Sequence, residues 1–283
     1  MDAIVLAGGS VQPDDPLAEH APGGVKCLAE VAGKPLVQWT LDALDATAGI
    51  DRVVVVGLPH DTPLTSRCRL LRLPAEGDMI GSIQAAADML TRDGDGAART
   101  GDGDGAAGTG DGDGAAGTGD GGHALVVAGD APLIDARVLR WAVDQVRERD
   151  PDVALCAVDR PVMEARFPGS KRTYVRLADH ELCGGDVAAV RLSVVRTGSD
   201  VPRRLSQARK QPWRIALVIG PGTLLALLLR RLRLAEAERR IGRRLGLRAA
   251  VLVCPYAEVA MDVDKPSQLA LARAALEARH TPA

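Results

Sequence analysis

Two acidic positions that lie far apart in the sequence have the chemistry to hold a divalent cation. Asp130 lies two residues after the end of the apolar run 124–128, and Asp264 lies with Asp262 in the string 261–266. Mg²⁺ takes one or two carboxylates together with phosphate oxygens, so Asp130 and Asp264 are candidate metal ligands. Asp262 and Asp264 would point to the same side of an extended segment, so one could bind the metal while the other supports it. Turn and helix-capping roles are the competing structural explanations.

A glycine-rich turn near the N-terminus is a candidate phosphate-binding loop. It follows the apolar run 3–6, and the loop after it ends at Lys26. Glycines after a buried strand let the backbone approach a phosphate, and a lysine can neutralise a triphosphate as a point charge. The turn alone is a weak signal, because such turns are common and the sequence contains neither a Walker A string nor GxGxxG. The candidate nucleotide contacts of this turn are Leu6, Ala7, Gly8, Gly9 and Ser10.

A second candidate nucleotide contact opens a predicted helix. Gly81 and Ser82 end the string 76–82, and they could serve a base or ribose through backbone groups. Capping of the helix is at least as good an explanation. The five histidines are scattered, and no Ser-His-Asp or Cys-His pattern is present, so the sequence does not indicate a protein nucleophile.

Apolar runs and helical periodicities alternate along most of the chain. The runs typical of buried strands are 3–6, 52–57, 124–128, 153–158 and 251–254. The segments with helical spacing are 36–44, 82–90, 138–146, 235–245 and 267–278. This order predicts one α/β domain over residues 1–283, in which a mostly parallel sheet is covered by helices on both faces. Ligands of such sheets bind at the carboxyl ends of the strands, where the glycine turn and Asp130 are expected.

The later part of the chain is less regular. Strands are predicted at 174–177 and 187–192, on either side of a turn at Cys183–Asp186. The apolar run 215–229 is shorter than the ~20 residues needed to cross a bilayer and predicts a buried helix that begins near Pro221.

Two segments stand out by composition. Residues 93–122 are a Gly/Asp-rich repeat of period nine, predicted to be a disordered surface insertion because it offers only Ala, Gly and Thr to a core. A calcium-binding β-roll is the lesser alternative. Residues 203–248 hold thirteen Lys or Arg against two Glu. This basic helical subregion is predicted to be a solvated amphipathic face, with a surface for phosphates or an acidic membrane as the alternative.

Composition excludes several classes of protein. With 46% apolar residues the chain is not disordered as a whole, and its five separated cysteines form no CxxC pair. Six aromatic residues are too few for the stacking platforms of single-strand nucleic-acid binding. The N-terminal residues do not resemble a signal peptide, and we expect no transmembrane segment and a cytoplasmic location with reduced thiols. Homo-oligomerisation is left open.

The order and spacing of four strings resemble the MobA-like nucleotidyltransferases, relatives of the molybdopterin guanylyltransferases. The strings are residues 4–10, 26–36, 129–133 and 262–266. The resemblance covers most of the chain outside the repeat. It implies a three-layer α/β/α, GT-A-like (Rossmann-like) fold and transfer of a nucleotidyl group from an NTP to a phosphorylated or hydroxyl acceptor, with release of pyrophosphate.

The resemblance also implies roles for individual residues. The glycine turn would hold the nucleotide, Lys26 would bind its phosphates, and Asp130 and Asp264 would bind Mg²⁺; Lys26, Asp130 and Asp264 are thus the implied catalytic residues. A small phosphorylated acceptor would be the second substrate. The implied acceptor contacts are Lys171, Arg172, Gly184, Gly185 and Asp186.

One departure from the family pattern leaves alternatives open. Many members place an arginine shortly after the glycine loop, and this chain has none between Ser10 and Lys26. Either another base supplies that charge or the activity is weak. The alternatives are a GT-A glycosyltransferase, because residues 262–264 form a DxD string, and a non-catalytic nucleotide-binding or membrane-surface protein that uses the basic subregion.

Overall fold

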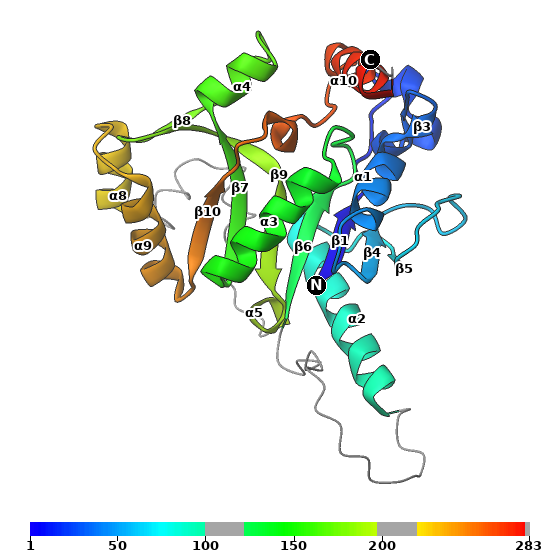
Figure 1. The fold of residues 1–283 in the computed structure, drawn as a ribbon, viewed down its shortest axis with the longest axis horizontal. Helices are drawn as coiled ribbons and strands as arrows, with labels where there is room; N and C mark the ends of the chain where they lie inside the picture. Colours follow the sequence, from blue (N-terminus) through cyan, green and yellow to red (C-terminus); the bar gives the residue numbers. More distant parts are fainter. Residues whose placement is uncertain (100–121, 197–219, 281–283) are drawn as a thin grey trace.

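The computed structural model describes residues 1–99, 122–196 and 220–280, and within them the central element is an eight-stranded sheet (Figure 1). Seven strands follow one another across it in the order β10-β7-β9-β6-β1-β4-β5, and β8 pairs with β9. Only β9 among these runs antiparallel to its neighbours β6, β7 and β8, so the predicted mostly parallel sheet is confirmed. The strands are β1 (Asp2–Leu6), β4 (Arg52–Val56), β5 (Arg69–Leu73), β6 (His123–Ala128), β7 (Val153–Asp159), β8 (Val175–Arg176), β9 (Glu181–Arg191) and β10 (Ala249–Val253).

Helices follow most of these strands. The α-helices are α1 (Leu36–Asp45), α2 (Met79–Arg99), α3 (Ala136–Arg149), α4 (Arg160–Arg166), α5 (Leu192–Arg196), α8 (Pro221–Leu228), α9 (Leu234–Leu245) and α10 (Pro266–His280). A short hairpin, β2 (Glu30–Val31) and β3 (Lys34–Pro35), precedes α1, and the 3-10 helix η4 (Ala257–Ala260) follows β10.

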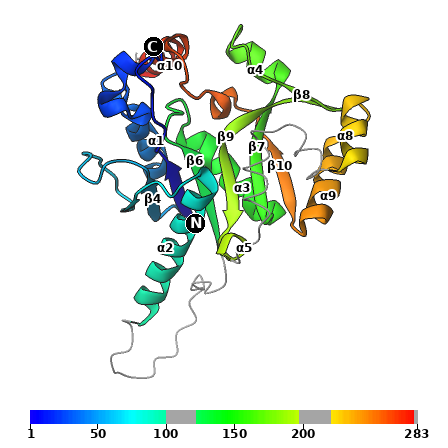
Figure 2. The ribbon, with the colours of Figure 1, turned by 180° about the vertical axis from the view of Figure 1, so that it is seen from behind.

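Alternation of side chains along the strands produces the three layers. Ala3 and Val5 of β1 pack into the larger core with α1 and α3, whereas Ile4 packs into a second core with α2 and α5. The same alternation holds along β4 and β6. Because successive side chains of a strand point to opposite faces, each strand is anchored to both helical layers. Figures 1 and 2 show the two faces of this α/β/α arrangement.

Two of the predicted elements were wrong. Cys183–Asp186 is not a turn but lies within β9, because Cys183 and Gly184 pair with Val158 and Ala157 of β7, and β9 continues between β6 and β7 from Val187. The helix that begins at Pro221 exists, but it is not buried: Leu225, Leu228 and Leu229 are more than half exposed.

The unusual segments are only partly described. Helix α2 continues into the start of the repeat as far as Arg99, while residues 100–121 lie outside the described residues. Of the basic subregion, residues 203–219 lie outside them too. The described remainder forms α8 and α9, and α9 ends at Gly246 in the left-handed conformation, as its sequence predicted.

Candidate active site

Three neighbouring parallel strands end at the same edge of the sheet. Strand β1 lies between β4 and β6, and the residues after their carboxyl ends are Ala7, Gly57 and Gly129. Ala7 N donates to Val56 O (2.9 Å), and Gly129 N donates to Leu6 O (2.9 Å). The pairing of the three strands therefore continues for one residue beyond their carboxyl ends. This edge therefore brings the glycine turn and Asp130 together, as the α/β pattern predicts.

The glycine turn packs closely against Gly57, a residue that the sequence analysis did not single out. Gly57 has a φ of +95°, and a Cβ on it would lie 2.7 Å from Gly8 N. Gly8, Gly9 and Ser10 are exposed, whereas the side chain of Ala7 is buried in the core. Ala7 as a whole is 0% exposed and its N–H is used by Val56 O, so the structure leaves this residue no surface for a nucleotide. The one sequence signal for Gly57 is that it ends the run of four valines in β4.

The loop after the turn folds back and returns Lys26 to it. Ser10 and Val25 form an antiparallel bridge, and Lys26 N donates to Gly9 O (2.9 Å). The neighbouring thiol of Cys27 is buried, and burial together with the charge of Asp130 raises its pKa. A buried thiol with a raised pKa is a poor nucleophile.

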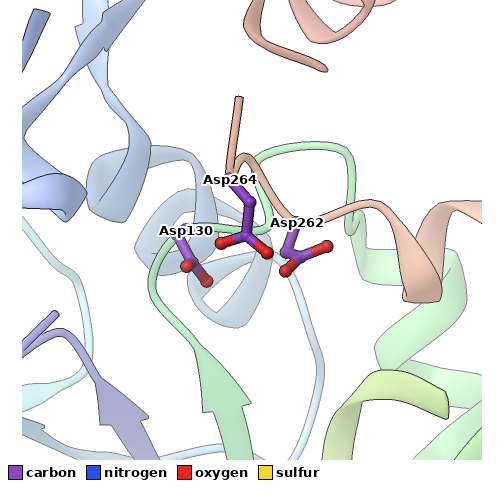
Figure 3. A group of neighbouring side chains, drawn as sticks. All are labelled: Asp130, Asp262 and Asp264. Carbon is purple, nitrogen blue, oxygen red and sulfur yellow. The ribbon is translucent and has the colours of Figure 1, made fainter. Parts of the chain in front are cut away.

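Asp130, Asp262 and Asp264 form one group, which we call the aspartate cluster. One carboxylate oxygen of each lies within 4.8 Å of those of the other two. Figure 3 shows the three side chains pointing toward one another from two segments. Val263 N donates to Asp130 O (2.9 Å) and its side chain is buried, so the two flanking aspartates point to the same side, as the period-two geometry predicts.

Lys26 is ion-paired with two members of the cluster. Its Nζ lies 2.6 Å from Asp130 Oδ2 and also donates to Asp264 Oδ1. Burial by itself lowers the pKa of Lys26, but the charges of Asp130 and Asp264 outweigh it and hold that pKa above its ordinary value. Partial burial raises the pKa of Asp264, but the hydrogen bond from Lys26 outweighs burial and lowers that pKa. Lys26 is therefore charged at neutral pH.

Arg172 holds the third aspartate. Its Nη1 donates to Asp262 Oδ1 (2.7 Å), and its Nη2 donates to the carbonyl of Ala260. Burial raises the pKa of Asp262, the charge of Arg172 opposes this, and the nearby Asp264 adds to it. The guanidinium implied as an acceptor contact is thus engaged with the aspartate cluster, while the adjacent Lys171 is exposed.

Asp186 brings a fourth carboxyl group to the site from the middle of β9. The antiparallel register pairs Val187 with Val127, which places Asp186 beside the carboxyl end of β6 and hence near Asp130. Its Oδ2 is buried and accepts no hydrogen bond from the residues that the structure describes. Burial, reinforced by the charges of Asp262 and Asp130, raises the pKa of Asp186 well above its ordinary value.

The glycines beside Asp186 have different surroundings. A Cβ on Gly185 would lie 3.1 Å from Cys156 O, so that glycine packs against the neighbouring strand β7. Gly184 is exposed, and no described atom lies within 4 Å of where its Cβ would be.

The turn at the start of α2 has a structural role. Asp78 Oδ1 accepts from Gly81 N (2.8 Å), and Ser82 Oγ accepts from Glu76 N (3.1 Å). The capping bond is thus made by Asp78, while the buried Ser82 hydroxyl is used inside the turn. The residue just before this segment lies next to the glycine turn, because a Cβ on Gly8 would lie 3.4 Å from Ala75 Cβ.

A separate hollow of about 490 Å³ lies beside α9. None of the glycine-turn or aspartate-cluster residues lines it. The lining residues are Glu238, Arg239, Gly242, Arg243, Leu247, Arg248 and Ala249. The Arg248 side chain pairs with Asp150 and Asp152, so the charge of this wall is partly balanced within the fold. Within the described ranges, no helix combines the length and the apolar character that crossing a membrane would require.

The fold and the site define a class: a three-layer α/β protein with a Rossmann-like nucleotidyltransferase fold and an acidic group at the carboxyl edge of its sheet. The chain belongs to the MobA-like NTP transferase family, whose model matches residues 3–251, and it is a nucleotidyltransferase.

Solved structures share the fold of this chain. A hypothetical transferase from Thermus thermophilus is 33% identical, with a TM-score of 0.75 over 95% of this chain and 98% of its own. A 4-diphosphocytidyl-2C-methyl-D-erythritol synthase from Anaerococcus prevotii shares the fold at 10% identity, with a TM-score of 0.52 over 98% of this chain and 97% of its own. No curated protein has a sequence that matches this chain.

Proposed function

We propose that this nucleotidyltransferase transfers a nucleotidyl group from an NTP to a phosphorylated sugar or cofactor precursor, releases pyrophosphate, and uses Mg²⁺. The observation that carries the proposal is the convergence of Asp130 and Asp264, from opposite halves of the chain, beside the exposed glycine turn. Membership in an NTP transferase family favours this reaction over a glycosyltransferase or a non-catalytic role.

The donor set fits Mg²⁺. It consists of carboxylate oxygens, the ligands that this hard cation prefers, and Asp130 and Asp264 would hold it, with Asp262 in support. The buried Oδ2 of Asp186 accepts no hydrogen bond from the described residues, so a ligand bound at the site could supply the polar partner that this oxygen lacks. When bound, Mg²⁺ would neutralise charge on the phosphates of the NTP.

The chain's own residues would position the reactants. An acceptor oxygen attacks the α-phosphorus, a new P–O bond forms, and the bond to the bridging oxygen breaks so that pyrophosphate leaves. Such transfers depend on positioning and charge stabilisation rather than on a protein nucleophile. Gly8, Gly9 and Ser10 would hold the triphosphate, and Lys26 would neutralise it.

The remaining predicted contacts stay part of the proposal. Leu6, Gly81 and Ser82 would border the nucleotide, and the buried Ala7 would support the glycine turn instead of touching the nucleotide. The exposed Lys171 and Gly184 are better placed for an acceptor than Arg172, because the Arg172 guanidinium is engaged with Asp262. We further propose a cytoplasmic location, in keeping with the five cysteines, all of which are free thiols.

A pyrophosphate-release screen tests the proposal. Each of the four NTPs is incubated with Mg²⁺ and a panel of phosphorylated acceptors, and release should depend on one NTP and one acceptor class. Asp130→Asn should reduce turnover by about 10²-fold or more, as expected for loss of a preorganised charge. Asp42→Asn is the matched control, because Asp42 pairs with Lys34 (2.5 Å) away from the site. UDP-sugar turnover without pyrophosphate would instead identify a glycosyltransferase.

A further inference from the structure

The position of Lys26 bears on how a cation can reach the aspartate cluster. Its Nζ contacts Asp130 Oδ2 at 2.6 Å and also Asp264 Oδ1, and only 15% of the Lys26 side chain is exposed. These carboxylates are the two proposed as metal ligands. An Mg²⁺ ion lies about 2.1 Å from its ligand oxygens, so it would stand next to the ammonium group if both used the same carboxylates.

Two cations cannot share these oxygens without strong repulsion. The energy between charges a few ångströms apart is large in a partly buried site, and a divalent ion doubles it. Removal of the lysine, in contrast, would leave the cluster with Arg172 as its one directly paired cation among the described residues.

The Lys26 side chain also has another anionic partner within reach once a nucleotide binds. Its stem runs along the glycine turn, since a Cβ on Gly9 would lie 3.7 Å from both Lys26 Cβ and Lys26 Cδ. The turn is where the proposed function places the triphosphate. A phosphate there would take over the ammonium group and free the carboxylates.

We propose that Lys26 is the resident counter-ion of the aspartate cluster and must leave it before a divalent cation binds, so that metal and nucleotide binding depend on each other. This inference rests on the proposed function. It assigns to the nucleotide-free protein a weak affinity for divalent cations. By linkage, each ligand then tightens the binding of the other by the same factor.

Binding of Mn²⁺ alone, without nucleotide, tests the inference by electron paramagnetic resonance of the free ion. Lys26→Met should bind Mn²⁺ at least about tenfold more tightly than the unmodified protein. Lys26→Arg, which keeps the charge, should bind as weakly as the unmodified protein, and Lys34→Met, which removes a lysine paired with Asp42, should change nothing. The tight binding should disappear in Lys26→Met/Asp130→Asn.

The outcomes separate the two proposals. If the unmodified protein and Lys26→Met bind Mn²⁺ equally well, and Asp130→Asn abolishes the binding, the displacement of Lys26 by the cation is overturned. The metal site of the proposed function would then still stand. No binding that depends on Asp130 in any variant would overturn both. If Lys26→Met folds poorly, Mn²⁺ should raise its Tm more than it raises that of the unmodified protein, and an equal or smaller rise contradicts the exchange.

Discussion

The backbone N–H of Val263 donates to the carbonyl of Asp130 at 2.9 Å, and this contact joins the two halves of the aspartate cluster. Val263 is 1% exposed, so the same residue that carries the hydrogen bond also anchors the segment in the larger core. Asp262 and Asp264 on either side of it are thereby held facing Asp130.

Truncation of this anchor should cost stability and activity together. Val263→Ala removes two buried carbon atoms and should lower the free energy of unfolding by about 2 kcal/mol. It should also lower kcat, because the flanking aspartates lose their support. Urea denaturation and pyrophosphate release measure the two effects. Val195→Ala in the second core is the matched control: it should cost stability with kcat unchanged. Equal kcat in both variants would contradict the anchoring role.

Gly57→Ala should damage the glycine turn. At a φ of +95° any side chain is strained, and the new Cβ would meet Gly8. We expect a loss of roughly 1–3 kcal/mol in the free energy of unfolding together with weaker NTP binding, measured by calorimetry. Gly246→Ala is the control, because Gly246 has a φ of +68° but open space around its Cβ position, so that variant should lose stability only. Unaltered NTP affinity in Gly57→Ala would mean that the turn does not hold the nucleotide.

Arg172 should behave as a positioning residue for Asp262. Arg172→Met leaves Asp262 unpaired beside Asp264, and we expect kcat to fall by about 10–100-fold, as for other residues that orient ligands, with little change in the KM for the acceptor. Arg172→Lys should restore part of the loss. A large rise in acceptor KM at constant kcat would instead identify Arg172 as a direct acceptor contact.

Asp152 should make stability depend on pH. It accepts from Arg248 N (2.8 Å) and from Arg191 Nε (3.0 Å), which ties the strands β7, β9 and β10 together. Partial burial raises its pKa, but these hydrogen bonds outweigh burial and lower it.

A lowered folded-state pKa stabilises the protein at pH values above the unfolded pKa of about 3.9, and this stability is lost as the pH falls through the folded value. The free energy of unfolding should therefore drop below about pH 4, and Asp152→Asn should flatten that drop. Asp144→Asn, at an exposed position on α3, should leave the curve unchanged. An identical acid transition in Asp152→Asn would contradict the assignment.

The strands and helices that carry the site were predictable from local patterns. The valine run of β4 and the apolar run of β6 can be buried only as central strands, and Gly246 ends α9 as its position suggests. Segments whose structure depends on partners distant in the sequence could not be predicted from local patterns. The strand β5, with two arginines among three leucines, forms because β4 offers it an edge. Cys183 and Gly184 extend as part of β9 because they pair with Val158 and Ala157 of β7.

The sequence by itself determined the chemistry of the site, because it specifies the glycine turn, the lysine and the aspartates. The order of the strands places the segments that hold these residues at one edge of a mostly parallel sheet. Only the tertiary structure decided how these charges are paired. Arg172 turns to Asp262, Lys26 lies between Asp130 and Asp264, and Asp186 enters from a reversed strand. Pairing of charges depends on distances of a few ångströms between side chains from separate strands and loops, and such distances arise from packing rather than from spacing along the chain.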